Sequence, residues 1–149
     1  MDENALSLFS KLQSVQTEQE LASCNDLSAR YGLTLTQSEM RELSLARAQS
    51  LRETGRVEFG GGILPKLIYA FCDSPYIQSD EYEATLAELQ DAFYYIKGEA
   101  LEQYSDDELI EYMQKAFNGP AEGSVDYLTG STLEELARLA REGWRDEGR

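Results

Sequence analysis

The chain offers carboxylates, and not histidines or thiol pairs, as its main source of chemistry. Its 149 residues include 28 acids, no histidine and two cysteines. The commonest general base, the usual partner of a serine or cysteine nucleophile and the usual zinc ligand are therefore all missing. Cys24 and Cys72 lack CxxC spacing and fall on apolar stripes, which predicts two buried thiols. We accordingly favour a protein that is not an enzyme.

Acids three residues apart on a helix can hold Mg²⁺, as they do in all-α nucleotide pyrophosphohydrolases. Random placement of 28 acids in 149 residues gives about as many such pairs as the chain contains. The pairs are Glu39/Glu42, Asp80/Glu83, Glu88/Asp91, Glu99/Glu102 and Glu108/Glu111. We therefore expect no metal or other cofactor, and a small helical enzyme that depends on Mg²⁺ or binds a nucleotide is the alternative.

A glycine-rich segment ahead of an apolar run could bind an anion. Gly60, Gly61 and Gly62 precede a predicted helix that contains Lys66, and backbone N–H groups at a helix start attract negative charge. The spacing matches neither GxxxxGK nor GxGxxG. A flexible entry loop is therefore the competing interpretation of this candidate anion-binding loop.

Charge is distributed unevenly along the chain, whose formal net charge is −15. Residues 73–111 contain twelve acids and one lysine, whereas residues 30–66 contain six bases and four acids. Such an acidic stretch repels nucleic-acid phosphates, so we expect no direct nucleic-acid binding. The candidate protein-interaction face consists of Glu99, Glu102, Asp106, Asp107, Glu108, Glu111 and Tyr95.

Three interpretations of the acidic segment stay open. It can be a solvated helix surface. It can be a face that binds a basic partner, and one form of this interpretation is a nucleic-acid mimic that binds a basic protein. It can also meet the arginines of a second copy in a homo-oligomer. Our leading hypothesis is a non-enzymatic protein-interaction or regulatory domain with an acidic binding face.

The elements that carry these residues are predicted to be helices. A Ser or Thr followed three residues later by Glu can satisfy the unpaired N–H groups of a first helical turn. The pattern occurs four times ahead of runs with helical apolar spacing, at Thr17/Glu20, Thr36/Glu39, Ser105/Glu108 and Ser131/Glu134. The sequence therefore predicts an all-α fold.

We expect a compact bundle of about seven helices. Two short helices cover about 6–15 and 21–31, and a third covers 37–54 and ends at Gly55. An apolar helix at 63–73 is predicted to lie at the centre. One long helix near 80–104 has apolar residues spaced by four and three residues. A helix near 109–117 precedes a linker at 121–130, and a last helix near 133–144 follows the linker.

No domain boundary interrupts this pattern, so residues 1–149 are predicted to form a single helical domain. The start Met1-Asp2-Glu3 does not resemble a secretory signal, and the longest apolar stretch is too short to span a membrane. We expect a cytoplasmic protein that does not contact membranes.

The segment from Val57 to Ile77, with the sequence VEFGGGILPKLIYAFCDSPYI, and the downstream segment SDDELI at 105–110 resemble a small bacterial protein family of unknown function. The similarity covers most of the chain. The resemblance implies a bacterial cytosolic protein and supplies no activity, ligand or catalytic residue.

Overall fold

In a computed structural model the chain folds into six α-helices without a β-strand in residues 3–58, 61–99, 103–133, 135 and 138–139, the residues that the structure describes. Side chains are described from residue 16 onward, apart from those of 131–133. The helices are α1 Glu3–Ser28, α2 Gln37–Thr54, α3 Ile63–Phe71, α4 Tyr82–Glu99, α5 Asp106–Asn118 and α6 Val125–Tyr127. The predicted all-α class is confirmed, with six α-helices in place of about seven.

Two of the predicted helix starts are confirmed as capping boxes. Thr36 accepts a hydrogen bond from the N–H of Glu39, whose carboxylate accepts one from the N–H of Thr36. Ser105 and Glu108 form the same reciprocal pair at the start of α5. Gly55 ends α2 with φ 72°, a left-handed conformation that glycine adopts without a side-chain clash.

The predicted break at residue 17 is wrong. The expected helices at 6–15 and 21–31 form one helix, α1, because Thr17 and Glu20 do not cap a helix start. The Thr17 hydroxyl accepts a hydrogen bond from the Arg47 guanidinium, and the Glu20 carboxylate accepts a hydrogen bond from the N–H of Gly61. Thr17 and Glu20, which the local pattern predicted to cap a helix start, therefore form hydrogen bonds to distant parts of the chain instead.

α3 lies at the centre of the molecule, as predicted. It packs against α1, α4 and α5, and its buried side chains are Ile63, Leu64, Leu67, Ile68 and Phe71. Phe71 meets the ring of Phe117 edge-on at a centroid distance of 5.2 Å, a favourable aromatic geometry that joins α3 to α5. Cys24 and Cys72 are both buried and free, in agreement with the sequence prediction.

α4 is shorter than the predicted helix at 80–104. A 3₁₀ turn, Ser79–Glu81, precedes it, and Gln103 and Tyr104 lie outside helical structure. The predicted apolar seam is confirmed where side chains are described, because Tyr82, Leu86, Leu89, Phe93 and Ile96 are all buried. Ala100, the last predicted member of the seam, lies outside the described residues.

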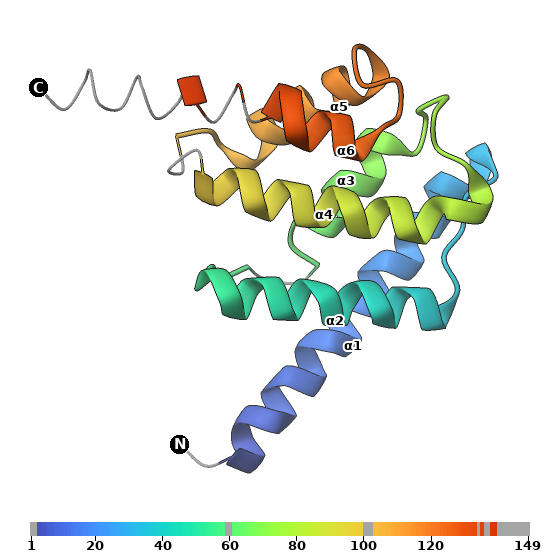
Figure 1. The fold of residues 1–149 in the computed structure, drawn as a ribbon. Coiled ribbons are helices and arrows are strands. Elements are labelled where there is room, and N and C mark those ends of the chain that lie inside the picture. The colour runs from blue at the N-terminus through green and yellow to red at the C-terminus, as the bar shows by residue number, and fades with distance from the viewer. Residues whose placement is uncertain (1–2, 59–60, 100–102, 134, 136–137, 140–149) are drawn as a thin grey trace, which may run out of the picture.

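α2 and α4 lie side by side and run in the same direction, and α5 and α6 lie beyond α4 (Figure 1). The predicted linker at 121–130 is partly helical: α6 is followed by a π-helical turn, Leu128–Leu133, which includes the predicted cap residue Ser131. Most of the last predicted helix lies outside the described residues. None of the helices in the described part of the chain is both long and apolar enough to cross a membrane.

Candidate functional site

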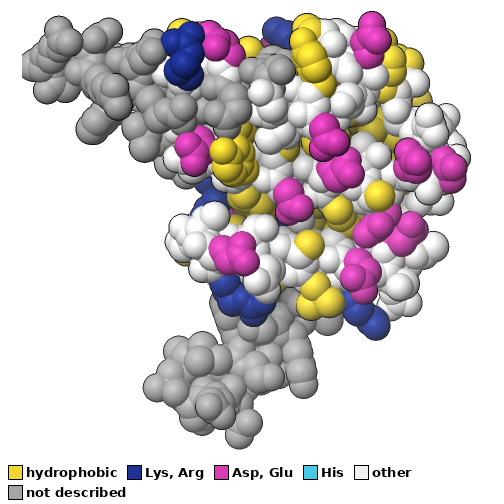
Figure 2. Space-filling view, in the orientation of Figure 1, with side chains coloured by type: hydrophobic (Ala, Val, Ile, Leu, Met, Phe, Trp, Pro, Cys, Tyr) yellow, Lys and Arg dark blue, Asp and Glu magenta, His cyan; other side chains and the backbone are white. Residues whose placement is uncertain are grey.

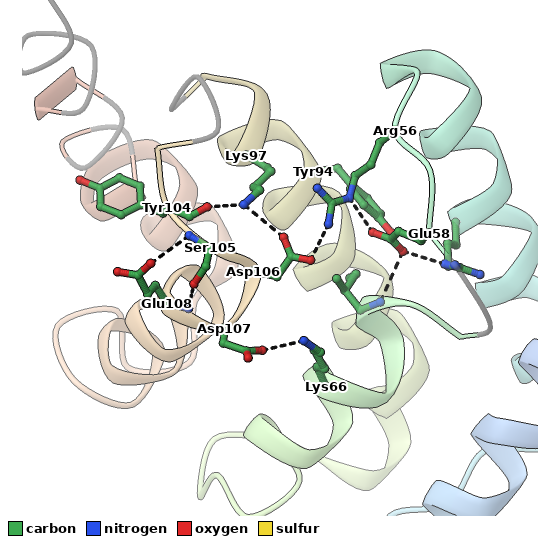
Figure 3. A network of polar contacts seen from close by, with 12 residues as sticks. Arg56, Glu58, Lys66, Tyr94, Lys97, Tyr104, Ser105, Asp106, Asp107 and Glu108 are labelled. Carbon is green, nitrogen blue, oxygen red and sulfur yellow. Dashed lines mark hydrogen bonds and ion pairs between the residues drawn. The ribbon is translucent and has the colours of Figure 1, made fainter.

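Glu58 is the hub of a buried charge network between α2, α3 and α4 (Figure 3). Its side chain is 5% exposed and accepts hydrogen bonds from Arg47 Nε at 3.0 Å and Arg56 Nε at 2.7 Å. The Tyr94 hydroxyl donates a third bond at 2.8 Å. Burial and the neighbouring carboxylate raise the pKa of Tyr94, so its phenol is a neutral donor.

Asp106 extends the network to the start of α5. Its carboxylate pairs with Arg56 through Oδ2 and with Lys97 Nζ through Oδ1 at 3.1 Å. Lys97 is 5% exposed and also donates to the carbonyl oxygen of Tyr104. A buried lysine without a partner would be costly, so the contacts of Lys97 stabilise the packing of the end of α4 against the start of α5.

Sequence reasoning missed this network. Arg47 lies four residues after Leu43 and seven after Met40, in the apolar register of α2, and is 6% exposed. A charged residue in that register signals a buried partner, because a buried charge is stable only when it is paired. The pattern could not identify these partners, because Glu58 lies 11 residues after Arg47 and Asp106 lies 50 residues after its partner Arg56.

The predicted anion-binding loop contacts carboxylates of its own chain. The N–H of Gly61 donates to Glu20 at 2.6 Å, and the N–H of Ile63 contacts Glu58 at 3.4 Å. Lys66 Nζ lies 2.7 Å from Asp107, which raises the pKa of Lys66. Gly60 lies outside the described residues, and binding of an external anion at Gly61, Gly62 and Lys66 stays a prediction.

The acids of the predicted interaction face have different partners in the structure. Asp106 lies in the charge network, Asp107 pairs with Lys66, and Glu111 pairs with Lys115 at 2.9 Å.

Glu108 caps α5, and its bonds to Ser105 lower the pKa of its carboxyl. Tyr95 and Glu99 lie on α4, where Tyr95 is 49% exposed, and Glu102 lies outside the described residues. Binding of a partner by these residues stays a prediction.

A different set of acids gathers where α2 and α4 meet. Glu83 on α4 is partly buried, and burial together with the negative charges of Glu39 and Glu42 on α2 raises its pKa. Burial and the charge of Glu53 likewise raise the pKa of Asp91. We call these five residues the α2–α4 acidic face: Glu39, Glu42, Glu53, Glu83 and Asp91.

Within the described part of the chain, no residue of the α2–α4 acidic face forms an ion pair with a lysine or arginine. Glu39 caps the start of α2, and Glu53 accepts a hydrogen bond from the side-chain amide of Gln49. Neither contact neutralises the negative charge of the carboxylate. Figure 2 shows acidic side chains over this side of the molecule, with exposed hydrophobic side chains between them and cations towards the edges.

The remaining candidates for chemistry are the thiols and the acid pairs. Burial raises the pKa of both Cys24 and Cys72, which keeps the thiols protonated and poorly nucleophilic. Where residues are described, no three acid or cysteine side chains come together in a way that could hold a metal ion.

The chain matches a family of unknown function (DUF6323) over residues 20–146 and belongs to that family. No curated protein and no solved structure matches the chain. The family resemblance expected from the central segment is thus confirmed, and the function has to be argued from the residues themselves.

Proposed function

We propose that this chain is a non-enzymatic protein-interaction domain that binds a basic partner surface through the α2–α4 acidic face. The observation that carries the proposal is that carboxylates of two adjacent parallel helices repel one another, Glu83 with Glu39 and Glu42 and Asp91 with Glu53, without a basic partner in the described structure. Like charges held together raise the free energy of the isolated protein, and a cationic partner would relieve this repulsion.

Exposed apolar groups beside the acids support the same proposal. Leu45 follows Glu42 by one turn of α2 and is 55% exposed, and Tyr95 follows Asp91 by one turn of α4 and is 49% exposed. Interfaces combine apolar or aromatic anchors with complementary charge, since burial contributes affinity and charge contributes specificity and association rate. The expected partner therefore presents lysines or arginines around an apolar centre.

The test compares two triple variants that change the net charge equally. Glu42→Gln, Glu83→Gln and Asp91→Asn neutralise the face, whereas Asp73→Asn, Glu122→Gln and Asp126→Asn neutralise three exposed acids outside it. Each protein is immobilised and used to capture proteins from a lysate of its source organism, and the captured proteins are identified by mass spectrometry.

We expect a basic protein that the wild type and the control variant retain, that the face variant loses, and that added salt releases. A partner retained equally by both triple variants would refute this face. A third variant, Asp107→Asn with Glu111→Gln, tests the sequence-predicted face on α5, where both residues are exposed.

A further inference from the structure

A pocket of about 250 Å³ opens beside the buried charge network, at the C-terminal ends of α2 and α4. Its described lining consists of Thr54, Gly55, Arg56, Tyr94, Lys97 and Gly98. The lining contains two cations, a phenol and a hydroxyl, and no carboxylate among the described residues. This is unexpected in a chain with 28 acids and 13 bases, and it gives the described pocket lining a local excess of positive side chains.

The cations of the pocket are held in place by the network behind them. Lys97 is 5% exposed and bound to Asp106 and to the Tyr104 carbonyl, and Arg56 is fixed by Glu58 and Asp106. The Arg56 guanidinium also lies over the Phe93 ring, 5.7 Å from its centroid. Side chains fixed in this way bind a ligand without a large loss of conformational entropy.

Gly98 forms part of the pocket wall. Glycine inside a helix costs roughly 0.5–1 kcal/mol relative to alanine. Gly98 does not have a positive φ, and a Cβ placed on it would meet nothing within 4 Å. Neither backbone conformation nor packing therefore requires glycine here, whereas the absence of a side chain keeps the pocket wall open.

We propose that this pocket binds a small anionic ligand, one that carries a carboxylate or phosphate group, through Arg56 and Lys97. The hydroxyls of Tyr94 and Thr54 already donate to Glu58 and to the Ser50 carbonyl oxygen, so the contacts to the anion come from the two cations. The anion joins Glu58 and Asp106 as a further partner of Arg56 and Lys97. The site is separate from the α2–α4 acidic face and does not depend on its role.

Sodium phosphate and sodium succinate, each titrated into ¹⁵N-labelled protein, distinguish the two anion types, and sodium chloride at equal ionic strength is the control. We expect saturable shifts of the amide signals of residues 54–56 and 94–98 with at least one of the two probes. Gly98→Leu, which places a side chain into the opening, should weaken this binding by about tenfold or more. Ala84→Leu adds the same side chain at an exposed position near the start of α4 and should leave binding unchanged.

Saturable binding that Gly98→Leu does not weaken would overturn the proposal, as would the absence of saturable shifts with both probes. If Gly98→Leu does not fold, Gly98→Ala and the map of shifted amides in the wild type decide the question. Shifts centred on residues other than 54–56 and 94–98 would then refute the pocket as the site.

Discussion

At the scale of single residues, the glycines ahead of α3 leave room for charged side chains from other elements. A Cβ on Gly61 would lie 2.4 Å from a Glu20 carboxylate oxygen, and one on Gly62 would lie 2.0 Å from Glu58 Oε1 and 2.6 Å from Arg47 Nη2. Gly62 also has φ 59°, which disfavours any other residue. Gly61 and Gly62 are therefore explained by packing of the chain's own ions, independently of any external ligand.

Gly62→Ala should destabilise the protein more than Gly55→Ala. Gly55 lies in the left-handed α region, where alanine strains the backbone by about 1–2 kcal/mol, whereas Gly62, with φ 59° and ψ −126°, lies outside that region and disfavours alanine more strongly. Only at Gly62 would the added methyl group also displace the Arg47–Glu58 pair, because a Cβ on Gly55 meets nothing within 4 Å. Urea unfolding measures both variants, and equal losses would show that the charge network does not require Gly62.

Glu58→Gln should lower the free energy of unfolding by about 3–5 kcal/mol, since it leaves the buried Arg47 without its carboxylate partner and removes one of the two carboxylates that pair with Arg56. Glu111→Gln breaks an exposed pair with Lys115 and should cause no measurable change. Chemical denaturation of both variants checks this difference. A loss at Glu58 as small as that at Glu111 would mean that the network does not stabilise the fold.

At the scale of elements, sequence patterns succeed where local interactions determine the structure. The capping boxes at Thr36 and Ser105 are formed within four residues, and both were predicted. The same pattern at Thr17 failed because Thr17 and Glu20 bind Arg47 and Gly61, which follow 30 and 41 residues later. The apolar spacing of α3 and α4 likewise predicted which residues are buried, whereas it could not predict which acids of separate helices face one another.

The parallel arrangement of α2 and α4 creates a pH dependence at their contact. The raised pKa of Glu83 means that the folded protein holds this proton more tightly than the unfolded chain does. The stability contribution of Glu83 is therefore greatest at low pH and falls as the pH rises from the ordinary value of 4.5 through the raised value. Glu83 thus opposes folding at neutral pH.

Glu83→Gln should accordingly stabilise the protein at neutral pH, by up to about 0.5 kcal/mol, and this gain should vanish near pH 3. Glu88→Gln, at an exposed position of the same helix, is the matched control. Urea unfolding at both pH values measures the effect. A gain that is independent of pH would rule out repulsion from Glu39 and Glu42 as its cause.

At the scale of the whole molecule, three basic side chains neutralise two acids inside the fold, which adds to the excess of acids over bases elsewhere in the chain. Arg47 and Lys97 are buried, and Arg56 is 18% exposed, so three of the 13 bases neutralise Glu58 and Asp106 within the structure. The net charge of −15 is therefore borne largely by exposed carboxylates. Such an excess disfavours the compact state through self-repulsion, which salt screens.

Added salt should raise the melting temperature of the wild type, and less so that of the variant with Glu42→Gln, Glu83→Gln and Asp91→Asn. Between about 0.02 and 0.5 M NaCl the Debye length falls from about 20 to 4 Å, which screens carboxylates held together across α2 and α4. The control variant with Asp73→Asn, Glu122→Gln and Asp126→Asn has the same net charge and should keep most of the wild-type response. Equal responses of the two variants would assign the repulsion to net charge alone. A smaller response of the face variant would locate it where α2 and α4 meet, the surface from which a cationic partner would remove the same repulsion.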